Sequence, residues 1–460
     1  MRGKFKFLPI LILVLILLTH TFILKNLIFF PYPELFIYPY LTNNGLKPYQ
    51  DILDQHFPGL MFLPINFDNL GMTNPFIARI WSIVNVLIIQ VLLYLIGRKI
   101  FKSNSKPLLI NLLYLIWQPF FEGWVLWIDN FLPLFLLPAF YFLLKFFDDK
   151  RGKLLFLVGL FLGLGIVFKQ VLIPLSILLF IYLFFSVKNN KTLFSYCLGV
   201  ILPGVLMLIY LFSIGVFADF FYWSVIFNLT IYAHHGSRIA PSFSHLIRVG
   251  IVYACALLAF LNKDKRLLYL LTIFIIGSIA GALARFDFVH FQPSLPFITI
   301  ATAVGFYELV KLKQVKYVLL SYFALALYWL TPFYKGNISE KIYFFDTDTL
   351  VLSEKIKDLT EEGDKTFIFG PPPHIYQITK TVPAGNVFVF QFPWFLQVAE
   401  DRVLTGLIKD KPEIIVSERE LEIEGEKIKD FAPKIDQYIQ SNYVEVDKVN
   451  SVKILRKLPN

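Results

Sequence analysis

The sequence has little of what a disulfide scaffold or a paired-cysteine metal module needs. It contains two cysteines in 460 residues, Cys197 and Cys255, and both lie inside apolar runs, so neither kind of site is available. Charge is also scarce, because only 17% of the residues are charged whereas 57% are hydrophobic. A soluble core cannot hide that much apolar surface, and this composition therefore predicts an integral membrane protein.

The net charge of +10 is not gathered on one solvated face, as nucleic-acid binding requires, and we expect no nucleic-acid partner. Instead, the basic residues form short clusters between apolar runs, at every second predicted crossing, which is typical of cytoplasmic loops. The clusters are Arg2/Lys4/Lys6, Arg98/Lys99/Lys102/Lys106, Lys145/Lys150/Arg151/Lys153, Lys188/Lys191, Lys263/Lys265/Arg266 and Lys311/Lys313/Lys316.

A helix needs about 20 apolar residues to cross a bilayer, and the apolar runs predict about eleven crossings. The predicted segments are 7–30, 77–97, 107–121, 130–147, 154–168, 171–187, 192–214, 246–261, 267–284, 295–310 and 317–333. The first run is too long for a signal-peptide core and is interpreted as a retained helix with a cytoplasmic N-terminus. An odd number of crossings then places the C-terminal tail outside the membrane.

The stretches predicted to face outward are 31–76, 122–129, 215–245 and 285–294. The first is rich in proline and contains amphipathic pieces such as Tyr49–Gln55, which predicts short helices along the membrane surface.

The composition changes near Tyr334, where charged residues become regularly spaced. We therefore expect a transmembrane domain at 1–333 and an extracytoplasmic domain at 334–460. The tail predicts helices at 349–362, 395–409 and 430–441 and strands at 366–369, 387–390, 413–416, 443–448 and 451–456. The expected fold is mainly α and polytopic, with a small α/β C-terminal domain. The run GPPP at 370–373 is interpreted as a strand-end turn, because it lacks the glycine pattern and the lysine of a phosphate loop.

Acidic residues gather at the predicted outer ends of helices, where an ionisable group near a membrane is costly. They are Glu34, Asp51, Asp54, Asp68, Glu122, Asp129, Asp219 and Asp287. A solvated loop charge is the simpler interpretation for most of them. Glu34 and Asp129 are the exceptions, since each lies in an aromatic or apolar setting next to a helix start.

Lys169 and Gln170 lie between two apolar runs, at a turn on the predicted outer side. Snorkelling of the lysine is one interpretation. The other is that Lys169 meets an anionic group presented from the lipid, such as a phosphate. Arg285 and His290 lie on a later outer loop and are suited to another part of an anion clamp, although a lone histidine is more often structural.

An ordered series of motifs runs along the chain: GLKPYQD at 45–51, QHFPGL at 55–60, Gly71 with ARI at 78–80, WIDNFL at 127–132, GLFLGLGIVFKQ at 159–170, RFDFVHF at 285–291 with Pro296, and the strands at 369–376 and 412–416. This series resembles GT-C glycosyltransferases of the protein O-mannosyltransferase and aminoarabinose transferase branch. The sequence departs from the family pattern in two places. Glu34 replaces the usual aspartate and lies closer to the glycine, and His56-Phe57-Pro58 replaces a Lys/His-Pro-Pro turn.

This resemblance implies a hexosyl- or pentosyltransferase that moves a sugar from a polyprenyl phosphate to an acceptor hydroxyl at the outer membrane face, with inversion. It implies Glu34 as general base, with Asp51 as the alternative, and Asp129 as a group that orients hydroxyls or assists the base. Lys169, Arg285 and His56 are then candidates for the leaving phosphate, with Gln170 and His290 beside them. The implied partners are the lipid-linked sugar, a lipid, glycan or protein acceptor, and membrane lipids. The implied location is the plasma membrane of a prokaryote and its cell envelope.

Some relatives in this branch bind a divalent cation and others do not, so metal dependence stays open. Rival classes are a multi-pass transporter or flippase, a cell-wall polysaccharide ligase or polymerase, and a purely structural membrane protein. A transporter is expected to show charged or broken helices near the midplane and a repeated half. Here the charges lie at helix ends and no repeat is evident.

Overall fold

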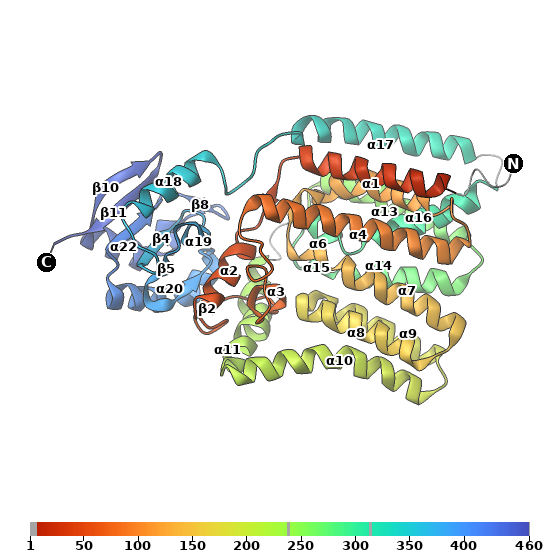
Figure 1. The fold of residues 1–460 in the computed structure, drawn as a ribbon, viewed down its shortest axis with the longest axis horizontal. Helices are drawn as coiled ribbons and strands as arrows, with labels where there is room; N and C mark the ends of the chain where they lie inside the picture. The colour runs from red at the N-terminus through yellow and green to blue at the C-terminus, as the bar shows by residue number, and fades with distance from the viewer. Residues whose placement is uncertain (1–6, 237–239, 312–314, 460) are drawn as a thin grey trace. The chain divides into compact units, whose positions relative to one another are not determined.

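The computed structural model describes residues 7–236, 240–311 and 315–459 (Figure 1). The predicted basic residues Arg2, Lys4, Lys6 and Lys313 lie outside these ranges. The structure is 68% helix. It divides into two compact units, which are described separately. The first unit comprises Met1–Phe30, Ala78–Met207 and Gly236–Lys341, and the second comprises Pro31–Ile77, Leu208–His235 and Ile342–Asn460.

The first unit consists of long apolar helices that run roughly parallel and antiparallel to one another (Figure 1). Elements lying wholly or mostly in it are α1 (Leu8–Asn26), α4 (Pro75–Phe101), α5 (Leu108–Gln118), η1 (Pro119–Gly123), β3 (Val125–Leu126), α6 (Ile128–Phe131), α7 (Pro133–Asp149), α8 (Gly152–Phe168), η2 (Gln170–Leu172), α9 (Ile173–Ser186), α10 (Asn190–Ser213), α13 (Phe243–Tyr253), η4 (Ala254–Leu261), α14 (Lys265–Ser278), α15 (Ala280–Ala284), η5 (Phe288–Phe291), α16 (Leu295–Leu309) and α17 (Val315–Asn337). Strand β1 (Phe30–Pro31) falls on the unit boundary.

Every predicted spanning segment is helical, but the count of 11 is not confirmed. Within the described residues, 7 helices are long and apolar enough to cross a membrane. They are Leu8–Asn26, Pro75–Phe101, Ile128–Asp149, Asn190–Ser213, Phe243–Leu261, Lys265–Ala284 and Tyr317–Asn337. The other predicted segments form the shorter helices α5, α8 with η2 and α9, and α16, because proline or a polar turn ends each apolar run early.

The glycines of α8 allow that helix to touch α10 backbone to backbone. A Cβ at Gly159 would lie 2.2 Å from the carbonyl oxygen of Tyr196, and one at Gly163 would lie 2.4 Å from that of Val200. Such close approach through small residues is a common way for membrane helices to associate, since lipid tails offer no hydrophobic drive. The contact fixes the C-terminal end of α8, where Lys169 begins the next turn.

Replacing Gly159 with valine is therefore expected to lower the melting temperature of the purified protein clearly. The added methyl groups must push α10 away, and overpacking of this kind costs about 1–3 kcal/mol. Gly204→Ala on α10 is the matched control, because no atom lies within 4 Å of a Cβ at that position. Thermal unfolding in detergent measures both, and equal melting temperatures for the two variants would contradict the close contact.

The second unit combines the predicted first outer stretch with the tail. Its elements are α2 (Glu34–Asn43), β2 (Ile52–Leu53), α3 (Gly59–Phe62), α11 (Phe217–Phe221), η3 (Tyr222–Tyr232), α12 (Ala233–Gly236), α18 (Thr347–Lys357), β4 (Lys365–Phe369), α19 (Ile375–Thr379), β5 (Val382–Pro383), η6 (Ala384–Asn386), β6 (Phe388–Val389), α20 (Pro393–Asp410), β7 (Ile414–Ser417), β8 (Glu422–Ile423), β9 (Glu426–Lys427), α21 (Ile428–Phe431), α22 (Pro433–Asn442), β10 (Tyr443–Val449) and β11 (Val452–Lys457). Five strands form one sheet in the order β10-β11-β7-β4-β5, in which β7, β4 and β5 are parallel.

The tail follows the predicted alternation of strands and helices, with α19, β5 and the β8–β9 hairpin as elements that the pattern did not predict. The run after β4 is the predicted strand-end turn, and Gly370 adopts φ 102° there. A side chain at this position would meet the carbonyl oxygen of Glu418 at 2.9 Å, so glycine is required for both reasons.

Two segments far away in sequence pack on the tail within this unit. Strand β2 pairs in parallel with β6, and the backbone N–H of Phe388 donates to the carbonyl of Asp51 at 2.8 Å. The ring of Phe227 in η3 stacks on Phe395 of α20, with centroids 5.1 Å apart. The expected amphipathic helix at Tyr49–Gln55 is wrong, because Tyr49 turns the chain with φ 63° and the next residues form β2.

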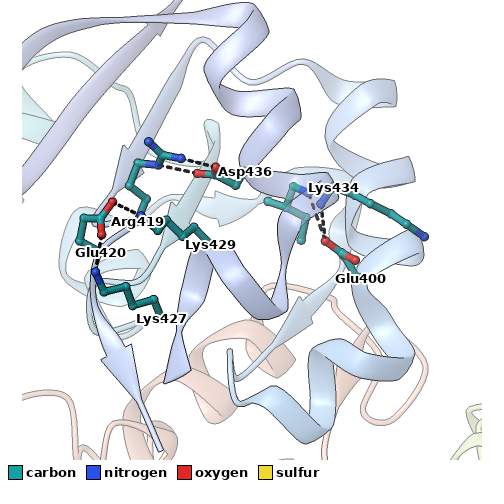
Figure 2. Close-up of polar contacts among 8 residues, drawn as sticks. Glu400, Arg419, Glu420, Lys427, Lys429, Lys434 and Asp436 are labelled. Atoms are coloured by element: carbon teal, nitrogen blue, oxygen red, sulfur yellow. Dashed lines mark hydrogen bonds and ion pairs between the residues drawn. The ribbon is translucent and has the colours of Figure 1, made fainter. Parts of the chain in front are cut away.

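Ion pairs connect neighbouring elements of the tail (Figure 2). Arg419 donates to both carboxylate oxygens of Asp436, at 2.9 and 2.6 Å. Glu420 accepts from Lys427 at 3.0 Å and from Lys429 at 2.6 Å, which ties the β8–β9 hairpin to the end of β7. Exposed pairs contribute little stability each, so their main effect is to fix the hairpin's position.

Candidate active site

Asp129 is the most deeply buried acidic group among the predicted site residues. It lies in α6, a single turn that Asn130 caps by accepting from the backbone N–H of Trp127 at 3.0 Å. Its side chain is fully buried, and Oδ2 lies 2.5 Å from Nζ of Lys169 and 3.1 Å from Nδ1 of His290. Three residues predicted separately, from α6, the end of α8 and η5, thus form one cluster in the first unit.

Lys169 is held in this cluster by the way α8 ends. The residue leaves the helix with φ −157° while its backbone N–H still donates to the carbonyl of Gly165 at 2.9 Å. Its side chain is 6% exposed and carries the ion pair with Asp129, so the snorkelling interpretation is wrong. A buried ammonium group needs such a partner, because leaving it unpaired would be strongly destabilising. Gln170 begins η2 directly afterwards and is half-buried.

His290 reaches Asp129 from η5, and a neighbouring amide fixes that loop. Nε2 of Gln292 donates to the carbonyls of Gln118 and Phe121, at 3.0 and 2.6 Å, which fastens the segment after His290 to the end of α5 and η1. A Cβ at Gly281 would lie 3.5 Å from Oδ1 of Asp129, so the backbone of α15 passes over the carboxylate. Within the described residues, that buried Oδ1 has no hydrogen-bond partner.

The cluster is poorly suited to a divalent cation. The ammonium group of Lys169 lies 2.5 Å from Oδ2 of Asp129, and its positive charge would repel a metal ion bound to the same carboxylate. In the part of the chain that the structure describes, no three His, Cys, Asp or Glu side chains come together as metal ligands would.

The other two predicted catalytic carboxylates, Glu34 and Asp51, and the predicted binding residue His56 belong to the second unit. Glu34 begins α2 directly after Pro33 and is 9% exposed. Asp51 is half-buried, and its Oδ2 accepts from the backbone N–H of Lys47 at 2.9 Å, which is a turn-forming bond. Asp51 therefore has a local structural task in this turn.

Asp54 is a residue that the sequence interpretation undervalued. It is 2% exposed, so its assignment as a solvated loop charge is wrong. It accepts from the hydroxyl of Tyr38 at 2.6 Å, and its other oxygen lies 3.0 Å from Nδ1 of His56. Burial is the main cause that raises the pKa of Tyr38, with the Asp54 charge second, so the hydroxyl stays protonated and donates. The short spacing from Asp54 to His56 was the feature of the sequence that could have indicated this pair.

Comparison with known proteins concerns a part of the chain that contains two of the three residues of the Asp129–Lys169–His290 cluster. Residues 56–223 match the family model described as dolichyl-phosphate-mannose-protein mannosyltransferase. This segment is therefore similar to a GT-C family domain. No curated protein matches the chain. The match contains His56, Asp129, Lys169 and Gln170, and it confirms the family resemblance.

The match and the apolar helices together support an integral membrane protein with the activity of a GT-C type glycosyltransferase. Arg285 and His290 lie beyond the matched residues, on a loop of the first unit. Arg285 donates from Nε to Asp287 at 2.9 Å and is 27% exposed.

Outside the segment that matches the family model, the first unit contains a cationic residue, Arg248, that the sequence did not single out as a site residue. The guanidinium carbon of Arg248 lies 4.2 Å from the ring centre of Phe120 and 3.7 Å from that of Phe288. Glu122 lies within electrostatic reach and accepts from the backbone N–H of Val289 at 3.1 Å. A charged residue inside the apolar run at 246–261 was the signal that could have found Arg248.

Glu122 predicts a measurable dependence of stability on pH. Burial, helped by the charge of Asp287, raises its pKa from 4.5 to about 6, against the opposing effects of Arg248 and the Val289 N–H. Between these two pH values the folded state binds more protons than the unfolded state. Stability therefore falls as pH rises through this window, by about 2 kcal/mol at most.

Glu122→Gln removes this titration and keeps an oxygen that can accept from Val289. Melting temperatures of both proteins at pH 4.5 and 6.5 measure the effect. We expect the wild-type protein to lose more stability over that interval than the variant does. The same slope in both proteins would contradict the burial of Glu122.

Proposed function

We propose that this protein transfers a hexosyl or pentosyl group from a polyprenyl phosphate to an acceptor hydroxyl at the outer membrane face, with inversion. The observation that carries the proposal is the buried Asp129–Lys169–His290 cluster, two of whose members lie inside the segment that matches the mannosyltransferase family model. The acceptor is a lipid, a glycan or a protein.

The chemistry requires a base for the acceptor and positive charge for the leaving group. Glu34 takes the proton of the acceptor hydroxyl, and Asp51 is the alternative base. The hydroxyl oxygen attacks the anomeric carbon, the bond from that carbon to the phosphate oxygen breaks, and the polyprenyl phosphate leaves with the electron pair. Negative charge grows on the phosphate in the transition state, and preorganised cations lower the barrier.

Lys169, Arg285 and His56 are the proposed cations for that phosphate, with Gln170 and His290 as further binding groups. Asp129 holds Lys169 in a fixed position through their ion pair, so this side chain need not be reorganised when the phosphate arrives, and His290 lies beside the same carboxylate oxygen. The second oxygen of Asp129 is suited to accept from a sugar or acceptor hydroxyl, since it has no partner among the described residues.

The packing of the second unit supports the predicted topology. Segments 31–77 and 208–235 lie in one compact unit with the tail, so all three must be on the same side of the membrane. An even number of crossings must therefore separate each from the next. The long helices alone provide an odd number of crossings in each interval. Between segments 31–77 and 208–235 they are α4, the continuous pair α6–α7, and α10. Between 208–235 and the tail they are the pair α13–η4, the pair α14–α15, and α17.

The shorter helices must then supply the missing crossings. One or all three of α5, α8 and α9 must span in the first interval, and α16 must span in the second. The total is therefore odd, which agrees with eleven crossings, a cytoplasmic N-terminus and an extracytoplasmic tail. We propose the plasma membrane of a prokaryote as the location, with a transmembrane domain at 1–333 and an extracytoplasmic domain at 334–460.

Single cysteines, introduced after Cys197→Ser and Cys255→Ser have removed the two native thiols, test this topology. Glu361 in the tail and Lys188 in the loop between α9 and α10 are both exposed. An impermeant maleimide added to intact cells is expected to label Glu361→Cys and to label Lys188→Cys only after permeabilisation. Labelling of the two positions in the reverse order, or of both in intact cells, would contradict the topology.

Mass spectrometry of lipids that copurify with the protein tests the function, together with a transfer assay on the polyprenyl-phosphate sugar so identified. We expect a glycosylated acceptor and free polyprenyl phosphate in equal amounts. Uptake of a labelled solute by proteoliposomes without any glycosyl product would instead identify a transporter and overturn the proposal.

A further inference from the structure

The α/β tail contains a cavity that the transferase chemistry does not use. It encloses about 600 Å³ of space, including its open mouth. Its walls include Phe367, Gly370, Tyr376, Phe390, Phe392 and Ile423, all from the second unit. The cavity therefore lies beside the carboxyl end of β4 and under the β8–β9 hairpin that follows β7.

The sheet topology places the cavity where open α/β folds bind ligands. From β4 the chain goes to β5 on one side of the strand and then to β7 on the other, so the strand order reverses at β4. In open α/β sheets, ligands bind in the crevice outside the carboxyl ends of the strands at such a switch point. The position of this crevice in the fold and the presence of a cavity are thus two independent observations that indicate a ligand site at the same place.

The chemistry of the walls indicates what kind of ligand fits. No charged side chain lines the cavity. The amide of Gln391 is used by the backbone, because Oε1 accepts from the N–H of Gly370 at 2.7 Å and Nε2 donates to the carbonyl of Ile368 at 2.6 Å. The hydroxyl of Tyr376 accepts from the N–H of Ile368 at 3.0 Å. These walls offer apolar contact and little that could balance a phosphate or a carboxylate.

We propose that this cavity binds a neutral aliphatic chain, of the isoprenoid or acyl type, in the extracytoplasmic tail. The proposal does not depend on the sugar-transfer chemistry. Burial of apolar surface supplies the binding energy, and the aromatic rings of the walls provide most of that surface.

The walls of the cavity are held rigidly from two sides. Glu420 fastens the β8–β9 hairpin through Lys427 and Lys429 (Figure 2), and this hairpin carries the wall residue Ile423. From behind, the ring of Tyr38 packs on Phe388 and Phe390, with centroids 6.0 and 5.5 Å away. A largely preformed site binds its ligand with less loss of conformational entropy.

Photolabelling of the full chain in lipid nanodiscs tests the proposal. The probe is a farnesol analogue that carries a diazirine, and mass spectrometry locates the label. We expect labelled peptides from residues 387–396 and 420–427, competition by excess unlabelled farnesol, and no competition by inorganic phosphate. Absence of label from these peptides, or displacement of the label by inorganic phosphate, would overturn the proposal.

Variants that fill the cavity, together with a matched control, test whether the label binds at this site. Ile423→Trp fills the mouth of the cavity, and Ile408→Trp on the exposed face of α20 is the matched control, since Ile408 is 48% exposed and does not line the cavity. Labelling is expected to fall roughly tenfold in the first variant, which corresponds to ~1.4 kcal/mol of binding energy, and to stay unchanged in the second. Val403→Phe fills the cavity from α20 and replaces Ile423→Trp if that variant does not fold. Unchanged labelling in a folded cavity-filling variant refutes the site.

Discussion

Replacing Asp129 with asparagine is expected to abolish sugar transfer and to destabilise the protein. The substitution leaves the buried ammonium group of Lys169 without its carboxylate. Breaking a buried pair by removing one partner costs about 3–5 kcal/mol, because an uncompensated charge remains. Lys169 and His290 also lose the group that positions them, and a small misplacement of such groups lowers the rate by about 10²-fold or more.

The double variant Asp129→Asn with Lys169→Met separates the two effects. It removes both charges, so the melting temperature is expected to recover towards the wild-type value while transfer stays absent. Thermal unfolding and the transfer assay on the same preparations measure this. Full transfer by either variant would refute the role of the cluster, and a single variant as stable as the wild type would refute the buried ion pair.

Glu34→Gln is expected to stop transfer without affecting membrane insertion. The amide keeps the size of the side chain but cannot take a proton from the acceptor, and general base catalysis contributes roughly 10²–10⁴-fold to such reactions. Transfer rates are compared at equal amounts of folded, membrane-inserted protein. Lys169→Ala, by contrast, is expected to weaken use of the lipid donor.

Asp51→Asn is the matched comparison, because Asp51 is the alternative base. Its Oδ2 accepts from the backbone N–H of Lys47, and an asparagine oxygen can do the same. We therefore expect a small change in rate for Asp51→Asn and a large loss for Glu34→Gln. The opposite pattern would transfer the role of base to Asp51, and wild-type rates in both would refute a carboxylate base at either position.

Much of the fold could be predicted from the sequence because its signals are local. Apolar runs mark helices wherever they occur, and all of the predicted membrane segments are helical. Strand and helix periodicity in the tail gave β4, β7, β10 and β11 for the same reason. The motif series found the family, and Asp129 and Lys169 within it, since both residues interrupt apolar surroundings.

Only the tertiary structure could decide which distant segments meet. The segment Tyr49–Gln55 looked amphipathic, yet it becomes a strand because β6, more than 300 residues later, offers it backbone hydrogen bonds. Asp54 looked like a solvated loop charge, yet Tyr38 and His56 enclose it. Burial and pairing are properties of the whole fold, and no local pattern carries them.

The candidate site likewise combines features that the sequence predicts with features that only the tertiary structure decides. The sequence by itself determined that the protein is embedded in a membrane, since composition and hydropathy suffice for that conclusion. It also selected Asp129, Lys169 and His290 one by one, as charged or polar groups at helix ends. That these three form one buried cluster was decided by the close packing of α8 on α10 and by the anchoring of η5 through Gln292. Convergence of side chains depends on how helices pack, and helix packing is a non-local property of the chain.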